Sequence, residues 1–414
     1  MRRVSDPVLI ALLALSCVFD TVAQTVVVPS AVPQTVVVPN AGLSEPGLAT
    51  PRFENLLQWG PVTLHPHVSY GVTHGTDISA GLGDRRDTFI HTFSPGMLFT
   101  LKDHWILDYT PSLAFYSDTN FQNTVNHAIN LTGQARYANW GFALVHRTAI
   151  TSEPLVETAA QTDQQTHDTS FKADYPLNSK ASLTFELDQK LHFVSGTEQN
   201  VSFASNLNSS RQWSGTVGFN YQFWSRLRGG VSLGAGYVDV DLGSDMTFEQ
   251  LNGTLSWLTT DKLDFSLSAG GEVRQFLGTA APDLVNPVFG ASVRYQPVET
   301  TTLSLTASRA VNASYFQSEI VEATSIGAGL QQRLLKRFYL RLSGGYTTSS
   351  YISTATGTTT TRTDNGFYFG TGLSCTFLKR GSFSVFYNYN ENSSSAGNFS
   401  FASSQIGCEI GYRY

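Results

Sequence analysis

The chain has 414 residues, of which 14% are charged and 12% aromatic, and its formal net charge is −6 at pH 7. This charge, without any basic stripe interleaved with aromatic residues, argues against a nucleic-acid partner. Mean hydropathy is near neutral, and no apolar run after the N-terminus is long enough for a membrane-spanning helix.

Residues 1–23 are typical of a secretory signal peptide. Arg2 and Arg3 provide the positive flank, residues 8–19 provide the apolar core, and Thr21-Val22-Ala23 is a small-residue cleavage site. The alternative is a lipoprotein anchored through Cys17, but the three residues before this cysteine form a poor lipobox. The ordinary export signal is therefore the preferred interpretation.

Residues 24–58 contain QTVVVP twice, at Gln24 to Pro29 and at Gln34 to Pro39. Repeated prolines and few residues that could form a core predict a Pro-rich, flexible periplasmic segment. A partner-binding arm is the alternative, and a tolerated flexible tail is preferred on composition.

From residue 59 to residue 414 the chain alternates apolar and polar side chains in segments of about ten residues. In Trp105 to Tyr116 the odd positions are apolar, whereas even positions include Asp108, Thr110 and Ser112. Successive side chains of a strand point to opposite faces, so each segment has one apolar and one polar face. The expected strands are 62–74, 88–101, 105–116, 123–137, 140–151, 166–175, 181–193, 211–223, 227–238, 247–258, 263–276, 284–295, 300–311, 320–334, 338–347, 363–377, 382–389 and 403–414.

This all-β pattern predicts a transmembrane antiparallel up-and-down β-barrel of about 18 strands, with 16 as a possible count. Short connections, as at Ala138-Asn139, alternate with long polar ones near 152–165, 194–210 and 348–364. Short periplasmic turns and long extracellular loops are the rule in bacterial barrels. Aromatic residues beside the short turns predict a periplasmic girdle. The alternative, a soluble β-sandwich, should show more irregular connections.

The last strand ends in SQIGCEIGYRY, with Ile406, Cys408, Ile410, Tyr412 and Tyr414 on one face. Here the sequence resembles Gram-negative outer-membrane β-barrel proteins, whose final strand ends in an alternating apolar series with a terminal aromatic. The resemblance implies that Tyr412 and Tyr414 form the signal read by the barrel-assembly machinery, although the family usually ends in Phe. Within that class the chain looks most like the putative β-barrel porin families, some of which are associated with exopolysaccharide export.

The polar face supplies candidates for the lining of an aqueous lumen. They are Arg136, Arg147, Arg228, Arg274, Arg294, Arg333, Arg341, Arg413, Asp108, Asp264, Glu272 and Glu409. Several of the arginines lie near the short turns, where they would favour anions at the inner mouth. The preferred alternative is that opposite charges on neighbouring strands, such as Asp264 and Glu272 with Arg274 and Arg294, pair and hold the wall in shape.

The third outer loop, Ser152 to Gln165, carries Glu153, Glu157 and Asp163. In general porins a long acidic third loop folds inward and faces an arginine wall to form a constriction, and here Arg136 and Arg147 lie on the two strands just before the loop. An ordinary solvated outer loop is the preferred interpretation, because loop length alone is a poor guide.

The sequence gives little sign of other chemistry. Cys375 and Cys408 fall on outward positions of strands separated by another strand, about 10 Å apart, so two unpaired thiols are expected. His65 and His67 share a face but lack a third ligand, so no metal site is predicted. No catalytic residue and no cofactor are predicted.

The leading hypothesis is a porin-like outer-membrane channel for passive diffusion of small hydrophilic solutes, surrounded by outer-membrane lipid. The alternative is an outer-membrane component of a surface-polysaccharide export or attachment system. The oligomeric state cannot be predicted, because an apolar subunit interface resembles a lipid-facing wall.

Overall fold

A computed structural model describes residues 57–414, apart from 82–83, 103, 156, 159, 197–206, 356–358 and 379. The signal peptide and nearly all of the predicted periplasmic segment lie outside the described residues, so these two predictions remain predictions.

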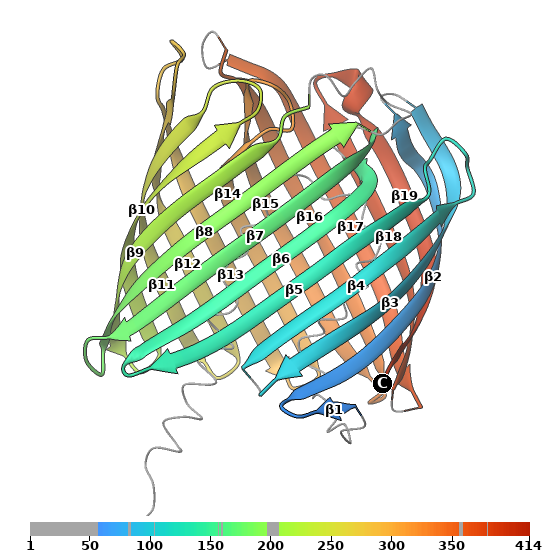
Figure 1. Cartoon of the computed structure of the whole chain (residues 1–414), viewed down its shortest axis with the longest axis horizontal. Helices are drawn as coiled ribbons and strands as arrows, with labels where there is room; N and C mark the ends of the chain where they lie inside the picture. Colours follow the sequence, from blue (N-terminus) through green and yellow to red (C-terminus); the bar gives the residue numbers. More distant parts are fainter. Residues whose placement is uncertain are drawn as a thin grey trace, which may run out of the picture.

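The described chain forms nineteen strands and one short 3-10 helix (Figure 1). The strands are β1 (Gln58–Trp59), β2 (Val62–Gly81), β3 (Asp84–Leu101), β4 (Trp105–Tyr116), β5 (Thr124–Tyr137), β6 (Trp140–Leu155), β7 (Ala160–Pro176), β8 (Ala181–Gly196), β9 (Ser210–Trp224), β10 (Leu227–Val240), β11 (Met246–Thr260), β12 (Leu263–Phe276), β13 (Leu284–Val298), β14 (Thr301–Ala313), β15 (Glu319–Leu334), β16 (Phe338–Ser353), β17 (Thr359–Phe377), β18 (Gly381–Ser394) and β19 (Phe401–Arg413), and the helix η2 (Gly397–Phe399) precedes β19.

Strands β2 to β19 form one closed antiparallel barrel. Each strand pairs with its neighbours in sequence, and β19 closes the ring by pairing with β2, where Ile410 lies opposite Tyr70. The barrel proper therefore has 18 strands, and the two-residue β1 pairs only with β2. This confirms the predicted fold and the higher of the two strand counts. Among the described residues, no helix is long and apolar enough to cross a membrane.

The outer wall carries the apolar half of the alternation. Leu187, Leu233 and Leu251 are 61%, 64% and 54% exposed on three different strands, as expected for side chains that face lipid rather than a protein core. Cys375 and Cys408 are free and occupy the same outward series, on β17 and β19 with β18 between them. The prediction of two unpaired thiols is confirmed.

One end of the barrel carries the tight connections, and it is called the short-turn end below. Its turns place non-glycine residues in the left-handed region, with φ of 47° at Lys102, 51° at Ala138 and 49° at Leu378. Positive φ matches the twist of tight hairpins. The C-terminus and β1 lie at this end, at the bottom of Figure 1.

The opposite end, called the loop end, differs from the sequence prediction. Strands continue well past the expected lipid boundary, so β3 begins at Asp84 rather than 88 and β16 ends at Ser353 rather than 347. The connection expected at 152–165 shrinks to residues 156–159 between β6 and β7. Backbone pairing within a hairpin does not require the apolar-polar alternation that lipid imposes, so the alternation underestimates these strands.

Candidate functional site

The pore-lining candidates all occupy the inward face. Directly paired residues share a face, and Arg294 lies opposite Asp264 and Ser304, whereas the neighbouring outward pair is Val293 with Phe265. The same alternation directs Arg136, Arg147, Arg228, Arg274, Arg333, Arg341, Arg413, Asp108, Glu272 and Glu409 inward.

Near the short-turn end the inward charges form loose pairs. Arg294 Nη2 is 3.8 Å from Asp264 Oδ2, and Lys172 Nζ is 3.8 Å from Asp174 Oδ2. Such water-exposed pairs contribute about 0–1 kcal/mol each and leave the field of the charges largely in place. Arg228 and Arg333 form no ion pair within the described part of the chain. Among the described residues, the inward arginines near this end include Arg136, Arg228, Arg294, Arg333, Arg341 and Arg413, and the inward carboxylates include those of Asp108, Asp174, Asp264 and Glu409.

At the loop end, the tip of the β6–β7 hairpin leaves the wall. The last backbone pair between β5 and β6 joins His127 and Ile150, yet β6 and β7 remain paired as far as Leu155 and Ala160. The side chain of Asn126 on β5 takes over the contact, accepting from the backbone N–H of Ser152 and donating to Glu153 Oε1 at 3.1 Å. Residues 151–164 are called the β6–β7 hairpin below.

A second hairpin, formed by β14 and β15, also leaves the barrel wall. Pairing between β13 and β14 stops at Phe289 and Arg309, whereas β14 and β15 remain paired to Ala313 and Ile320. Residues 310–323, called the β14–β15 hairpin below, then lean into the lumen. The outward series of the strand continues through Val311 and Ile320, so these side chains now face the inner wall rather than lipid.

An apolar cluster holds the β14–β15 hairpin inside the barrel. Ile320 is fully buried, and Val311 packs with it against inward residues of β10 and β11, including Val238 and Met246. Each buried aliphatic side chain contributes about 1.5–3 kcal/mol relative to exposure. The β10–β12 side of the loop end is therefore filled by a packed core.

A buried ion pair on β12 also holds the β14–β15 hairpin, because its arginine binds a backbone carbonyl of that hairpin. Arg274 Nη2 is 2.8 Å from Glu272 Oε1, and the guanidinium lies over the ring of Phe248. Arg274 also donates to the carbonyl of Val311 at 3.1 Å. Of the charges considered from the sequence, Arg294 and Asp264 pair between neighbouring strands as predicted, whereas Arg274 and Glu272 pair within the single strand β12.

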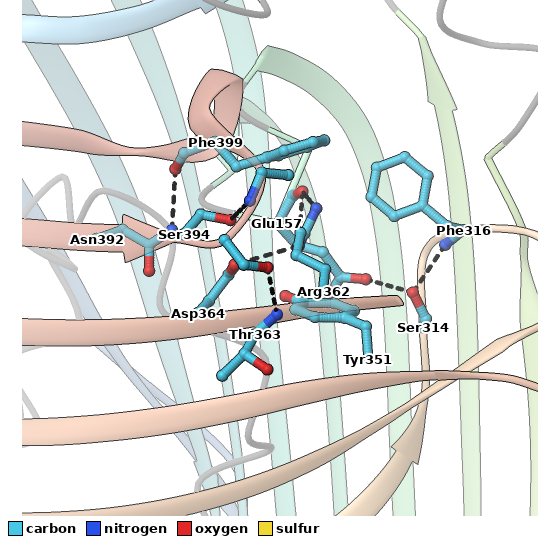
Figure 2. A network of polar contacts seen from close by, with 12 residues as sticks. Glu157, Ser314, Phe316, Tyr351, Arg362, Thr363, Asp364, Asn392, Ser394 and Phe399 are labelled. Carbon is cyan, nitrogen blue, oxygen red and sulfur yellow. Dashed lines mark hydrogen bonds and ion pairs between the residues drawn. The ribbon is translucent and has the colours of Figure 1, made fainter. Parts of the chain in front are cut away.

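The two hairpins meet across the lumen through Glu157 (Figure 2). Glu157 Oε1 accepts from the Ser314 hydroxyl at 2.7 Å and from the Tyr315 backbone N–H at 2.8 Å. Glu157 is fully buried, and burial raises the pKa of its carboxyl to about 7. A side chain expected at the tip of a solvated loop thus contacts the opposite hairpin inside the barrel.

Arg362 of β17 supports this contact from the other side. Both of its terminal nitrogens donate to the Glu157 carbonyl at 3.4 Å, and Asp364 Oδ2 lies 3.2 Å away. The guanidinium is stacked between Tyr351, at 3.7 Å from the ring centroid, and Phe399, at 4.0 Å. Figure 2 shows these side chains converging from β16, β17 and η2 on the tip of the β6–β7 hairpin.

The preferred interpretation of residues 152–165 as a solvated outer loop is wrong. Most of the segment is paired strand, Glu157 is buried, and Asp163 accepts from the Ser152 hydroxyl within the hairpin. The segment is buried because it contacts the β14–β15 hairpin. No pattern within residues 152–165 indicates this distant partner.

Sequence reasoning missed Arg362, Asp364, Ser314 and Tyr351. A signal was nevertheless present, because apolar residues occupy inward positions at the loop ends of β10 and β11, for example Val238 and Phe248. An apolar side chain on the wet face of a barrel predicts that something packs there.

A histidine of the first barrel strand, His67, lies beside a hydroxyl and a carboxylate of β4. His67 Nε2 lies 3.0 Å from Thr110 Oγ1 and 3.9 Å from Asp108 Oδ1, and among the described residues no group of three or more His, Cys, Asp or Glu could hold a metal ion.

A closed 18-strand barrel with an apolar outer wall and a charged inner wall is the architecture of a transmembrane β-barrel. The model of a family described as "Putative beta-barrel porin 2" matches residues 258–414, which contain β12 to β19. This match confirms the resemblance to β-barrel porins over the C-terminal part of the chain. No curated protein matches the sequence.

Solved structures similar to this chain include OpdK of Pseudomonas aeruginosa with vanillate, at 11% identity and a TM-score of 0.43, covering 85% of this chain and 99% of that one. OccAB3 of Acinetobacter baumannii has 10% identity and a TM-score of 0.43, covering 85% and 99%. A bacterial polysaccharide outer membrane secretin has 10% identity and a TM-score of 0.36, covering 85% and 98%.

Proposed function

We propose that the protein is a porin-like channel of the Gram-negative outer membrane for small hydrophilic solutes. A barrel of 18 strands is too wide for its own wall side chains to fill, so its charged inner wall encloses water. This closed barrel with inward charges is the observation that carries the proposal. By the rule for bacterial barrels, the short-turn end faces the periplasm and the loop end faces the external medium.

The channel has two zones of different character. The periplasmic mouth is lined by arginines such as Arg294 and Arg333, which favours anions. The outer end is narrowed by the β6–β7 and β14–β15 hairpins, which Glu157 joins across the lumen. Solutes therefore meet a constriction on the outer side and a positive mouth on the inner side.

Reconstitution in a planar bilayer tests the proposal. Purified, heat-modifiable protein is expected to give discrete conductance steps, and in a salt gradient the reversal potential should shift toward that of chloride. Folded protein that inserts but conducts no current would refute the channel.

Deletion of residues 24–58 provides a further arm of the same test. A channel that acts alone should keep its conductance without this segment. A component of a surface-polysaccharide export system would instead lose the binding of a periplasmic partner.

A further inference from the structure

The β6–β7 hairpin leaves the barrel wall as a paired unit. It loses its backbone partner on β5 beyond Ile150, and the polar contacts of Asn126 with Ser152 and Glu153 replace the ladder there. Its tip is held to the opposite side of the barrel mainly by Glu157, through the Ser314 hydroxyl and the Tyr315 N–H. The Glu157 carboxyl thus makes the contact with the β14–β15 hairpin, while Arg362 binds the Glu157 carbonyl and Gln161 bonds to the backbone of Gln122.

The site around Glu157 holds the neutral carboxyl better than the ionised one. Only Oε1 has partners, whereas Oε2 is buried without a hydrogen bond among the described residues. An ionised Oε2 would lack any donor in a site closed to water, which is costly. Burial accordingly outweighs the two hydrogen bonds and the charge of Arg362, and it raises the pKa of Glu157 to about 7 from its ordinary 4.5.

The charged and titratable groups around Glu157 do not reverse this preference. Arg362 on β17 favours the ionised form, but Asp364 of the same strand already pairs with it at 3.2 Å. Glu319 on β15 opposes ionisation. Tyr351 on β16 and Tyr315 in the turn are buried phenols, and Tyr315 is hydrogen-bonded to His192 of β8 at 3.1 Å.

We propose that Glu157 is a proton-operated latch: the β6–β7 hairpin spans the lumen while the carboxyl is protonated and is released from the β14–β15 hairpin when the carboxyl ionises. This inference rests on the proposed channel function. Since the loop end faces the medium, the latch makes conductance depend on external pH. The channel is narrow in acid and wider near neutrality.

The sign of the effect follows from linkage. A pKa higher in the docked than in the released hairpin means that the proton stabilises docking. This stabilisation is fully present below about pH 4.5 and is lost by about pH 7. Within this window the released-to-docked ratio rises by up to about tenfold per pH unit, the limit for one proton.

The experiment compares wild type with Glu157→Gln and Glu157→Ala in planar bilayers across this pH range. Glutamine keeps an oxygen for Ser314 and Tyr315 and cannot ionise, so Glu157→Gln should match wild type in acid and stay narrow at neutral pH. Alanine removes the contact, so Glu157→Ala should be wide throughout. Glu249→Gln, which removes an exposed outward carboxylate on β11, should keep the wild-type response.

A second readout follows the hairpin itself. In a background with Cys375→Ala and Cys408→Ala, the buried Thr158→Cys should react with an impermeant thiol reagent faster at neutral than at acid pH. Its rate is divided by that of the exposed Asp283→Cys, which removes the ordinary pH dependence of thiols.

The latch would be overturned by a Glu157→Gln channel that retains the wild-type pH response, or by a labelling ratio that does not change with pH. Absence of conductance in every variant would instead refute the channel, and the labelling ratio would then decide on the latch alone.

Discussion

Arg362 offers the sharpest test of how the loop end is held together. Its guanidinium and the Asp364 carboxylate are 8% and 2% exposed, so both charges are removed from water. Arg362→Met would keep the packing volume between Tyr351 and Phe399 and leave Asp364 buried without its counter-charge. Removing one partner of a buried ion pair typically costs about 3–5 kcal/mol.

This cost falls on the docked hairpin, because Arg362 also donates to the Glu157 carbonyl. A loss of about 3 kcal/mol lowers the docked-to-released ratio by about a hundredfold. In planar bilayers Arg362→Met should therefore conduct more than wild type at acid pH, where the wild-type hairpin is docked. The gel-shift temperature of the heat-modifiable barrel should change little, since the lipid-facing wall is untouched.

The double variant Arg362→Met with Asp364→Asn is the matched control. It removes both charges, and neutral replacements of buried ion pairs are often tolerated. Most of the docked population should return. A double variant as open as the single one, or a single variant as closed as wild type, would refute the assignment of the effect to the unpaired Asp364 charge.

Three further predictions concern other parts of the barrel. Ile320→Ala removes a fully buried side chain, so docking of the β14–β15 hairpin should weaken by about 2–5 kcal/mol. The current noise in planar bilayers should then rise. The control Val285→Ala changes a side chain of the outer wall that is 71% exposed, and it should leave the noise unaltered. Arg333→Gln should shift the reversal potential away from that of chloride without changing the gel-shift temperature, and an unchanged potential would refute the positive mouth. Deletion of Tyr414 should reduce the amount of folded barrel in the outer membrane, measured as the heat-modifiable fraction, and normal assembly would show that this residue is not read.

The difference between the wall and the loop end can be traced to particular residues. In Trp105 to Tyr116 every odd position is apolar, because that face meets lipid, and the bounds of the strand were predicted to the residue as β4. Beyond the lipid boundary this constraint ends, and the prediction stopped at 347 where β16 continues to Ser353. Inward positions of the candidate charges followed from the same alternation.

The apolar-polar alternation did not predict which residues each charged side chain contacts. Glu157 and Ser314 are 157 positions apart, and Glu157 and Arg362 are 205 apart, so no local pattern joins them. Their meeting depends on two strands leaving the wall at Ile150 and Arg309. The only sequence trace of this event is the presence of apolar residues such as Val238 on the wet face.

The sequence by itself therefore determined the wall: a strand count of about 18 with 16 still possible, the alternation, the last strand and the free outward thiols. These properties follow from a local rule, since every spanning residue faces either lipid or water. The tertiary structure alone decided which hairpins fold inward, which apolar residues they cover and that Glu157 joins them across the lumen. That outcome depends on the packing of segments that are distant in the chain, where the energy of each contact is set by its partner rather than by its sequence neighbours.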